Sequence, residues 1–107
     1  MMKKYKNLMV ATGILVLNQV VFAEEFEVLQ KNKDFSQKEI TIKVGDTISF
    51  KNEDDFHHNV FSLSDQAMFD LGSYDKGQAK SMTFEEAGDI EVECAIHPSM
   101  KMTVTVQ

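Results

Sequence analysis

Apolar and polar residues alternate along much of the chain, and the alternation is strongest near the C-terminus. Ile90, Val92 and Cys94 share one side of a predicted strand, while the acidic residues between them share the other side. Residues 100–106 repeat the pattern, with methionine and valine on the inward side. Because successive side chains of a strand point to opposite faces of a sheet, the pattern predicts two neighbouring strands. It also directs the thiol of Cys94 into the core.

The same period of two recurs in shorter runs between turn signals, and no long run has the 3.6-residue period of a helix. The expected strands cover residues 26–30, 40–44, 47–51, 56–62, 79–84, 89–94 and 100–106. About seven or eight short strands in a chain of this size are typical of an all-β fold. We expect a two-sheet β-sandwich with Greek-key connections.

Three connections are less regular than the strands. Residues 31–37 are largely polar and are expected to form a loop. Gly45-Asp46 is expected to turn the chain between two strands that lie side by side and antiparallel. Residues 63–74 show no clear alternation, and we expect a short helical turn around residues 65–69.

Residues 1–23 have the pattern of a secretory signal peptide. Three lysines precede a largely apolar run, and Val21-Phe22-Ala23 has the small-residue character of a cleavage site. The apolar run is interrupted by Asn18 and Gln19, and it falls short of the roughly 20 residues that span a bilayer. We therefore expect residues 24–107 to form one exported domain, periplasmic or otherwise extracytoplasmic, without stable membrane insertion.

Removal of the leader makes the chain strongly acidic. Three of the eleven lysines leave with it, so eight lysines face seventeen carboxylates and the formal net charge changes from -6 to -9. Such a surface repels nucleic acid and favours partners with a basic docking face. We expect the acidic stretch Glu53-Asp54-Asp55 to be solvated surface, with a docking role as the alternative. The single cysteine excludes an internal disulfide, which leaves a buried thiol, an intermolecular bridge or a metal ligand.

The residues from Cys94 to Met102 concentrate the metal-binding chemistry of the chain. They include the only cysteine, one of the three histidines, and the methionines Met100 and Met102. Thiolate and imidazole suit copper, and two histidines, one cysteine and a weak axial methionine form an electron-transfer copper centre. The second imidazole must come from His57 or His58. These two point to opposite faces of a regular strand, so we expect one to reach the centre and the other to lie at the surface.

The chain resembles the blue copper proteins of the plastocyanin, pseudoazurin and amicyanin group, the cupredoxins. The resemblance rests on His58-Asn59-Val60 and on Cys94-x-x-His97-Pro98-x-Met100. Supporting motifs are Asn52 with Asp54, Phe69-Asp70-Leu71-Gly72, and Phe84-x-x-x-Gly88. The similarity covers nearly all of residues 36–107. It implies a cupredoxin-like sandwich with one copper ion bound by His58, Cys94, His97 and Met100.

The ligand loop offers two methionines, and it departs from the family pattern at Ala95 and at Ile96, which replaces a frequent proline. Met100, six residues after the cysteine, matches an amicyanin-like loop, whereas Met102 has the spacing seen in plastocyanin and pseudoazurin. We favour Met100, because core packing explains Met102. Ala95 stands where many relatives have threonine or serine. Asn59 is therefore expected to bind main-chain groups of the loop alone.

The ligand set and the resemblance imply a one-electron carrier that cycles between Cu(I) and Cu(II). Copper with two imidazoles, a thiolate and a thioether keeps no good position for substrate, so we do not expect an enzyme. The expected partners are redox proteins such as a c-type cytochrome, a dehydrogenase or an oxidase, and the domain is expected to be a monomer. By resemblance, His97 should be the exposed ligand. The alternatives are a periplasmic copper-trafficking protein with the same ligands and a metal-free interaction module.

Overall fold

The computed structural model describes residues 22–107, and these residues form nine strands and no helix. The strands are β1 (Glu25–Lys31), β2 (Asp34–Phe35), β3 (Glu39–Ile42), β4 (Thr47–Asn52), β5 (His58–Ser64), β6 (Ala67–Tyr74), β7 (Ala79–Thr83), β8 (Gly88–Glu93) and β9 (Lys101–Val106). Most of the predicted signal peptide, residues 1–21, lies outside the described residues. Within the described part, no helix is long and apolar enough to cross a membrane.

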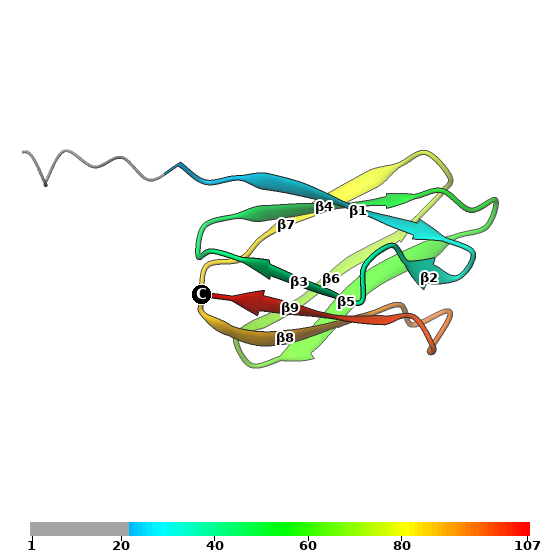
Figure 1. The fold of residues 1–107 in the computed structure, drawn as a ribbon. Coiled ribbons are helices and arrows are strands. Elements are labelled where there is room, and N and C mark those ends of the chain that lie inside the picture. Colours follow the sequence, from blue (N-terminus) through cyan, green and yellow to red (C-terminus); the bar gives the residue numbers. More distant parts are fainter. Residues whose placement is uncertain (1–21) are drawn as a thin grey trace, which may run out of the picture.

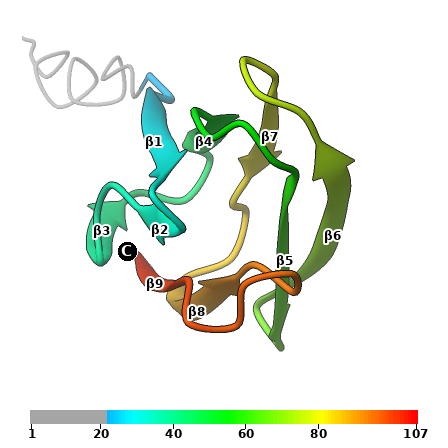
Figure 2. The same cartoon turned by 90° about the vertical axis from the view of Figure 1, so that its right-hand side faces the viewer.

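The strands form two sheets that face each other as a sandwich (Figure 1). One sheet has the order β2-β1-β4-β7 and the other has the order β3-β9-β8-β5-β6. The pairs β1–β4 and β3–β9 are parallel, whereas the other neighbours are antiparallel. Seen end-on, the strands surround a common interior (Figure 2). The predicted all-β sandwich is confirmed.

The core between the sheets is made of the inward residues of the alternating pattern. Ile48 and Phe50 of β4 are fully buried, as are Ile90 and Val92 of β8. Each such side chain contributes roughly 1.5 to 3 kcal/mol to folding when it leaves water. The inward side of β8 continues into Cys94, which is 1% exposed. The core thus holds the thiol in a fixed place at the end of a strand.

The helical turn expected around residues 65–69 is wrong. β5 and β6 form an antiparallel hairpin in which Ser64 is paired with Ala67, and residues 65 and 66 form its turn. β6 is the edge strand of its sheet, and half-buried residues interrupt the alternation of buried and exposed positions along it. A register irregularity between Asn59 and Phe61 disturbs the pairing further. An edge strand of this kind lacks the period of two on which the prediction depended.

The expected pairing of the strands around Gly45-Asp46 is also wrong. β3 pairs with β9 in one sheet, while β4 pairs with β1 and β7 in the other. The turn, in which Gly45 has a φ of 96°, carries the chain between the two sheets. Alternation identifies both strands but says nothing about which sheet each joins. In addition, residues 31–37 contain the two-residue strand β2, which brings the number of strands in the described part to nine.

Candidate metal centre

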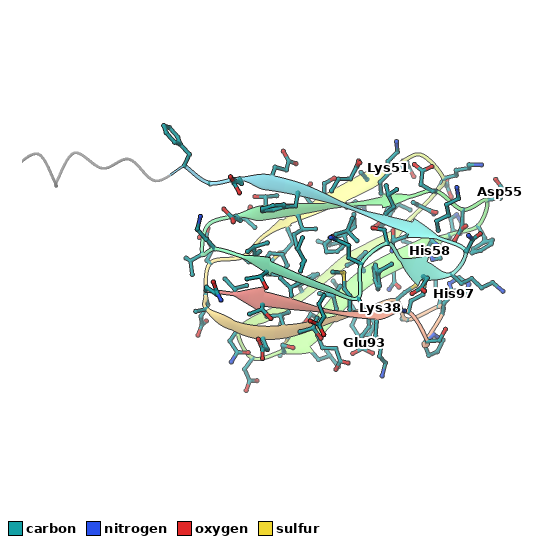
Figure 3. All side chains as sticks on the ribbon, in the orientation of Figure 1. Lys38, Lys51, Asp55, His58, Glu93 and His97 are labelled. Atoms are coloured by element: carbon teal, nitrogen blue, oxygen red, sulfur yellow. The ribbon has the colours of Figure 1, made fainter. Side chains whose placement is uncertain are left out.

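Three metal-binding side chains from two distant segments meet at one end of the sandwich. His58 is the first residue of β5, Cys94 follows β8, and His97 lies in the loop between β8 and β9. The Sγ of Cys94 is 3.7 Å from Nδ1 of His58 and 3.8 Å from Nδ1 of His97. The three donor atoms all lie within 4.8 Å of one another. The two imidazoles lie at the end of the sandwich away from the C-terminus (Figure 3).

The spacing of these atoms fits a metal ion placed between them. A first-row metal such as zinc lies about 2.0 Å from an imidazole nitrogen and about 2.3 Å from a thiolate sulfur, so such donors 120° apart are about 3.7 Å from each other. The observed sulfur–nitrogen distances are 3.7 and 3.8 Å. Two imidazoles and one thiolate in a trigonal arrangement are the ligand set of an electron-transfer copper site. The residues present therefore fit copper.

The carboxylate of Asp54 orients the ring of His58. Its Oδ2 lies 2.7 Å from Nε2 of His58. Because a carboxylate accepts hydrogen bonds, Nε2 carries the proton and Nδ1 keeps its lone pair for a metal. Burial raises the pKa of Asp54, but the hydrogen bonds from His58 and from the amides of Lys33 and Asn32 outweigh it, so the pKa lies below its ordinary value. The carboxylate therefore stays ionised beside the imidazole.

The prediction that Glu53-Asp54-Asp55 is solvated surface is wrong for Asp54, which is 8% exposed. Its two oxygens accept the amides of Asn32 and Lys33 at 2.8 and 3.1 Å. Both of these residues have left-handed backbone conformations, with φ of 56° and 60°. The same carboxylate thus fixes a strained turn and a candidate ligand. Strand parity was the available signal, because the inward side of β4 runs through Asn52 to Asp54.

Main-chain hydrogen bonds hold the loop that carries Cys94 and His97. The amide of Cys94 donates to the carbonyl of Met100 at 3.2 Å, and the amide of Met100 donates to the carbonyl of His97 at 2.8 Å. The Oδ1 of Asn59 accepts the amide of Ala95 at 2.7 Å. The expectation that Asn59 binds the main chain of the loop is confirmed. This bond ties β5 to the loop through the main chain of Ala95, whose side chain has no hydroxyl.

Met100 and Met102 occupy different levels of the core. Both are buried, at 0% and 2% exposure. In the β8–β9 ladder Met102 is paired with Val92, and the next pair joins Glu93 and Lys101. One further step along this register places Met100 opposite Cys94, in agreement with the hydrogen bond between their main chains. Met102 therefore lies one inward position deeper than the thiol, within the apolar core.

Sequence reasoning missed the aromatic ring of Phe56. The ring lies 5.3 Å from the ring of His58 and 5.2 Å from that of His97, measured between centroids, while the two imidazoles are 4.9 Å apart. Phe56 is 40% exposed and His97 is half-buried. The phenyl ring thus covers part of the imidazole pair from the solvent side. Its shared parity with His58 and Val60 was the signal that could have indicated this.

A buried polar network behind the centre was also missed. The hydroxyl of Tyr74 donates to Oε1 of Gln30 at 2.6 Å, and Nε2 of Gln30 donates to the carbonyl of Asn59 at 3.3 Å. Burial, followed by the negative charge of the Cys94 thiolate, raises the pKa of Tyr74. The network joins β1, β5 and β6 next to His58, which is paired with Tyr74 in the β5–β6 ladder. His57 is not part of it, since its exposed ring pairs with Asp75 at the surface.

Comparison with known proteins agrees with this donor set. Residues 23–107 match the family model described as copper binding proteins, plastocyanin/azurin family. The chain belongs to this family. Copper is therefore the metal for which this plastocyanin/azurin-family site is built, in agreement with its imidazole and thiolate donors.

Two proteins that are similar to this chain show how much of it the similarity covers. The methylamine utilization protein MauL of Methylorubrum extorquens is 33% identical over 85 residues, which cover 78% of the chain and 75% of that protein. A solved reduced tryptophan-to-tyrosine mutant of amicyanin has a TM-score of 0.73 at 31% identity, covering 81% of the chain and 86% of that structure. Both are therefore similar to the domain over most of its length.

A larger copper protein contains a similar domain. The Cu-containing nitrite reductase of Thermus scotoductus gives a TM-score of 0.71 at 28% identity, covering 78% of the chain. The chain spans only 22% of that reductase chain. The likeness therefore concerns one domain.

Proposed function

We propose that the protein is an exported one-electron carrier in which His58, Cys94, His97 and Met100 bind one copper ion. The observation that carries the proposal is the triangle of two Nδ1 atoms and one Sγ with the spacing of ligands around a single metal. Met100 completes the set by its position opposite Cys94. Membership of the plastocyanin/azurin family and similarity to amicyanin support the same function.

The protein's own contribution is to hold the donors still. Asp54 fixes His58, Asn59 fixes the amide that follows Cys94, and the core encloses the buried donors. When bound, copper supplies a one-electron couple between Cu(I) and Cu(II). A site whose donors are held by hydrogen bonds on several elements changes little in shape between the two states. His97, half-buried next to the exposed residues Ile96 and Phe56, is the ligand nearest to solvent and serves as the electron port.

The residues that could have extended the centre are otherwise occupied, which favours electron transfer over copper delivery. His57 pairs with Asp75 at the surface, and Met102 packs in the core beside Val92. With two imidazoles, a thiolate and a thioether in place, no site for substrate remains, and we propose that the protein is not an enzyme. Its function then depends on partners that give and take electrons.

The location and the partners follow from the sequence pattern and the charge. We propose export to the periplasm or another extracytoplasmic space, with a signal peptide at residues 1–23 and one domain at residues 24–107. The formal net charge of that domain, -9 by residue count, favours a basic docking face on its partner. We propose redox proteins such as a c-type cytochrome, a dehydrogenase or an oxidase, met by a monomer.

Addition of Cu(II) to the purified protein tests the centre. We expect an intense thiolate-to-copper absorption band in the visible, the EPR spectrum of a blue copper site, and a reversible one-electron wave in voltammetry. Cys94→Ser should abolish the band, whereas Ser99→Ala, an exposed change in the same loop, should leave it intact. A wild-type protein that binds no copper, or that shows no band dependent on Cys94, would overturn the proposal.

A further inference from the structure

Glu24 is the residue at which the chain joins the fold. Its carbonyl accepts the amide of Thr47 at 2.9 Å, and its own nitrogen donates to Oδ1 of Asp46 at 2.9 Å. Phe22, two residues earlier, is 78% exposed, and Ala23 is exposed as well. The first residue with hydrogen bonds to the fold among those described is thus the residue that follows the predicted cleavage site. The leader pattern and the hydrogen bonds of Glu24 therefore both indicate the peptide bond between Ala23 and Glu24.

Asp46 is a buried carboxylate that receives this nitrogen. Only 3% of the residue is exposed. Its Oδ1 accepts from Glu24, and its Oδ2 accepts the amide of Lys43 at 2.8 Å. The hydrogen bonds from Glu24 and then Lys43 hold the pKa of Asp46 below its ordinary value. In the uncleaved chain this carboxylate therefore carries a negative charge, and both of these partners are uncharged amides.

We propose that leader removal creates an ion pair: cleavage between Ala23 and Glu24 leaves the α-ammonium of Glu24 on the carboxylate of Asp46. The inference rests on the proposed export. A leader peptidase uses one water to break the carbon–nitrogen bond, leaving a carboxylate on Ala23 and an amine on Glu24, which takes up a proton at neutral pH. The nitrogen stays where it is and changes from an uncharged donor into a cation. Maturation thereby strengthens the contact that begins β1.

The surroundings of Glu24 suit an ammonium group. Glu24, Lys43 and Asp46 line a hollow of about 230 Å³ at the entrance of β1, so water can reach the added N–H donors. Asp46 is already ionised in the uncleaved chain, so what cleavage adds is the attraction between a positive and a negative charge, which is modest where water reaches the pair. Gln107 also lines the hollow, and the C-terminus lies at the end of the sandwich opposite His58 and His97 (Figures 1 and 3). The ion pair can therefore be tested without disturbing the copper centre.

The first test identifies the mature N-terminus. The full chain is produced in a bacterium that exports it, and the released protein is analysed by mass spectrometry and N-terminal sequencing. We expect Glu24 as the first residue. Any other first residue, or a retained leader, overturns the processing step while leaving the visible copper band unaffected. The outcome is thus distinguishable from a failure of the proposed copper function.

The second test isolates the charge. Two copper-loaded forms are compared, one beginning at Glu24 and one retaining Ala23, in which the Glu24 nitrogen remains an amide. All nine strands lie within residues 25–106, so both forms contain the complete described sandwich. We expect the Glu24 form to melt about 2 to 6 °C higher, a range expected for an ion pair in a domain of this size. Equal melting temperatures would overturn the ion pair.

Two further comparisons assign the effect to Asp46. Asp46→Asn should remove the difference between the two forms, whereas Asp70→Asn, which alters an exposed carboxylate that accepts the amide of Gly72 within the edge strand β6, should preserve it. If Asp46→Asn fails to fold, acetylation of the α-amino group of the Glu24 form replaces it. The acetylated protein should have the same melting temperature as the Ala23 form. A difference that persists after acetylation contradicts the proposal.

Discussion

The carboxylate of Asp54 decides which ring nitrogen of His58 is available to a metal. Imidazole has two nitrogens, and only the one without a proton binds metal. The carboxylate of Asp54 accepts a hydrogen bond from the protonated Nε2 of His58 at 2.7 Å, so Nδ1 of His58 faces Cys94 and His97. Its position beneath the β1–β2 turn keeps it out of water. The metal affinity of the site thus depends on a residue that does not touch the metal.

Asp54→Asn should weaken copper binding about 10- to 100-fold, the usual effect of losing the hydrogen-bond partner of a ligand histidine. The amide keeps the shape but lacks the charge that favours the proton on Nε2. Competition titration with a copper chelator measures the affinity. Asp55→Asn, one residue away and exposed, is the matched control and should bind as the wild type does. Equal affinities for the two variants would remove Asp54 from this role.

The two methionines should respond differently to leucine. Met100→Leu removes the thioether opposite Cys94 and should shift the reduction potential and the EPR spectrum, because the axial ligand tunes both. Met102→Leu conserves volume within the core and should cost less than about 1.5 kcal/mol of unfolding free energy without a spectral change. Voltammetry, EPR and chemical denaturation measure these effects. A spectral change confined to Met102→Leu would make that residue the axial candidate.

Residue-level prediction succeeded where chemistry and parity pointed the same way. Cys94 was placed inward by the alternation of β8, and the structure brings it together with His58 and His97. The role of Asp54 was missed because an acidic run is usually solvated surface. Phe56 was missed because an aromatic residue next to a loop has no chemistry of its own to indicate contact with a ligand. For both residues strand parity indicated the direction of the side chain, but it did not show which loops and ligands that side chain would meet.

At the level of elements, the β8–β9 hairpin is the main support of the site. Its ladder runs from Gly88 with Val106 to Glu93 with Lys101. Beyond the ladder, a short loop carries His97 and returns to Met100. β5 joins the hairpin through Asn59, whose side chain reaches the amide of Ala95. Loop and strand therefore act as one unit.

Asn59→Ala should loosen this unit. The amide of Ala95 loses its partner at an exposed position where water can replace it, so the loss should cost roughly 0.5 to 1.5 kcal/mol of unfolding free energy, and the loop should exchange its amide hydrogens faster. Denaturation of the metal-free protein and hydrogen exchange at Ala95 are the measurements. Asn59→Asp keeps an acceptor oxygen in place and should restore much of the protection. If the amide of Ala95 exchanged equally fast in Asn59→Ala and in the wild type, the link between β5 and the loop through Asn59 would be contradicted.

Element prediction was accurate for strands that are buried on one face and less so elsewhere. β4, β8 and β9 repeat with a period of two because one side packs in the core and the other meets solvent. β6, at the sheet edge, lacks this contrast and was not predicted as a strand. Sheet membership was not predictable for β3, since its parallel partner β9 lies about sixty residues later in the chain. Local patterns do not contain such distant pairings.

At the scale of the whole molecule, stability should fall in acid. The folded pKa of Asp46 is lowered by the amides of Glu24 and Lys43, so the unfolded chain binds a proton more readily. The stabilisation is present above the ordinary value of 3.8 and is lost as pH falls through the lower folded pKa. Melting temperatures of the metal-free protein between pH 6 and about pH 2 measure it. Asp46→Asn should flatten the acid decline, and Glu39→Gln, an exposed change, should leave the decline as it is.

The position of the C-terminus, at the end of the sandwich opposite the ligand loop, determines how the domain can be attached to a surface. Gln107 is held by two main-chain hydrogen bonds, to the carbonyl of Ile42 and from the amide of Val44. A linker attached beyond it would leave the molecule at the end far from His97 (Figures 1 and 3). A monolayer tethered to an electrode in this way would expose the imidazole end to dissolved proteins. Orientation on a surface would thus be set by the polypeptide itself.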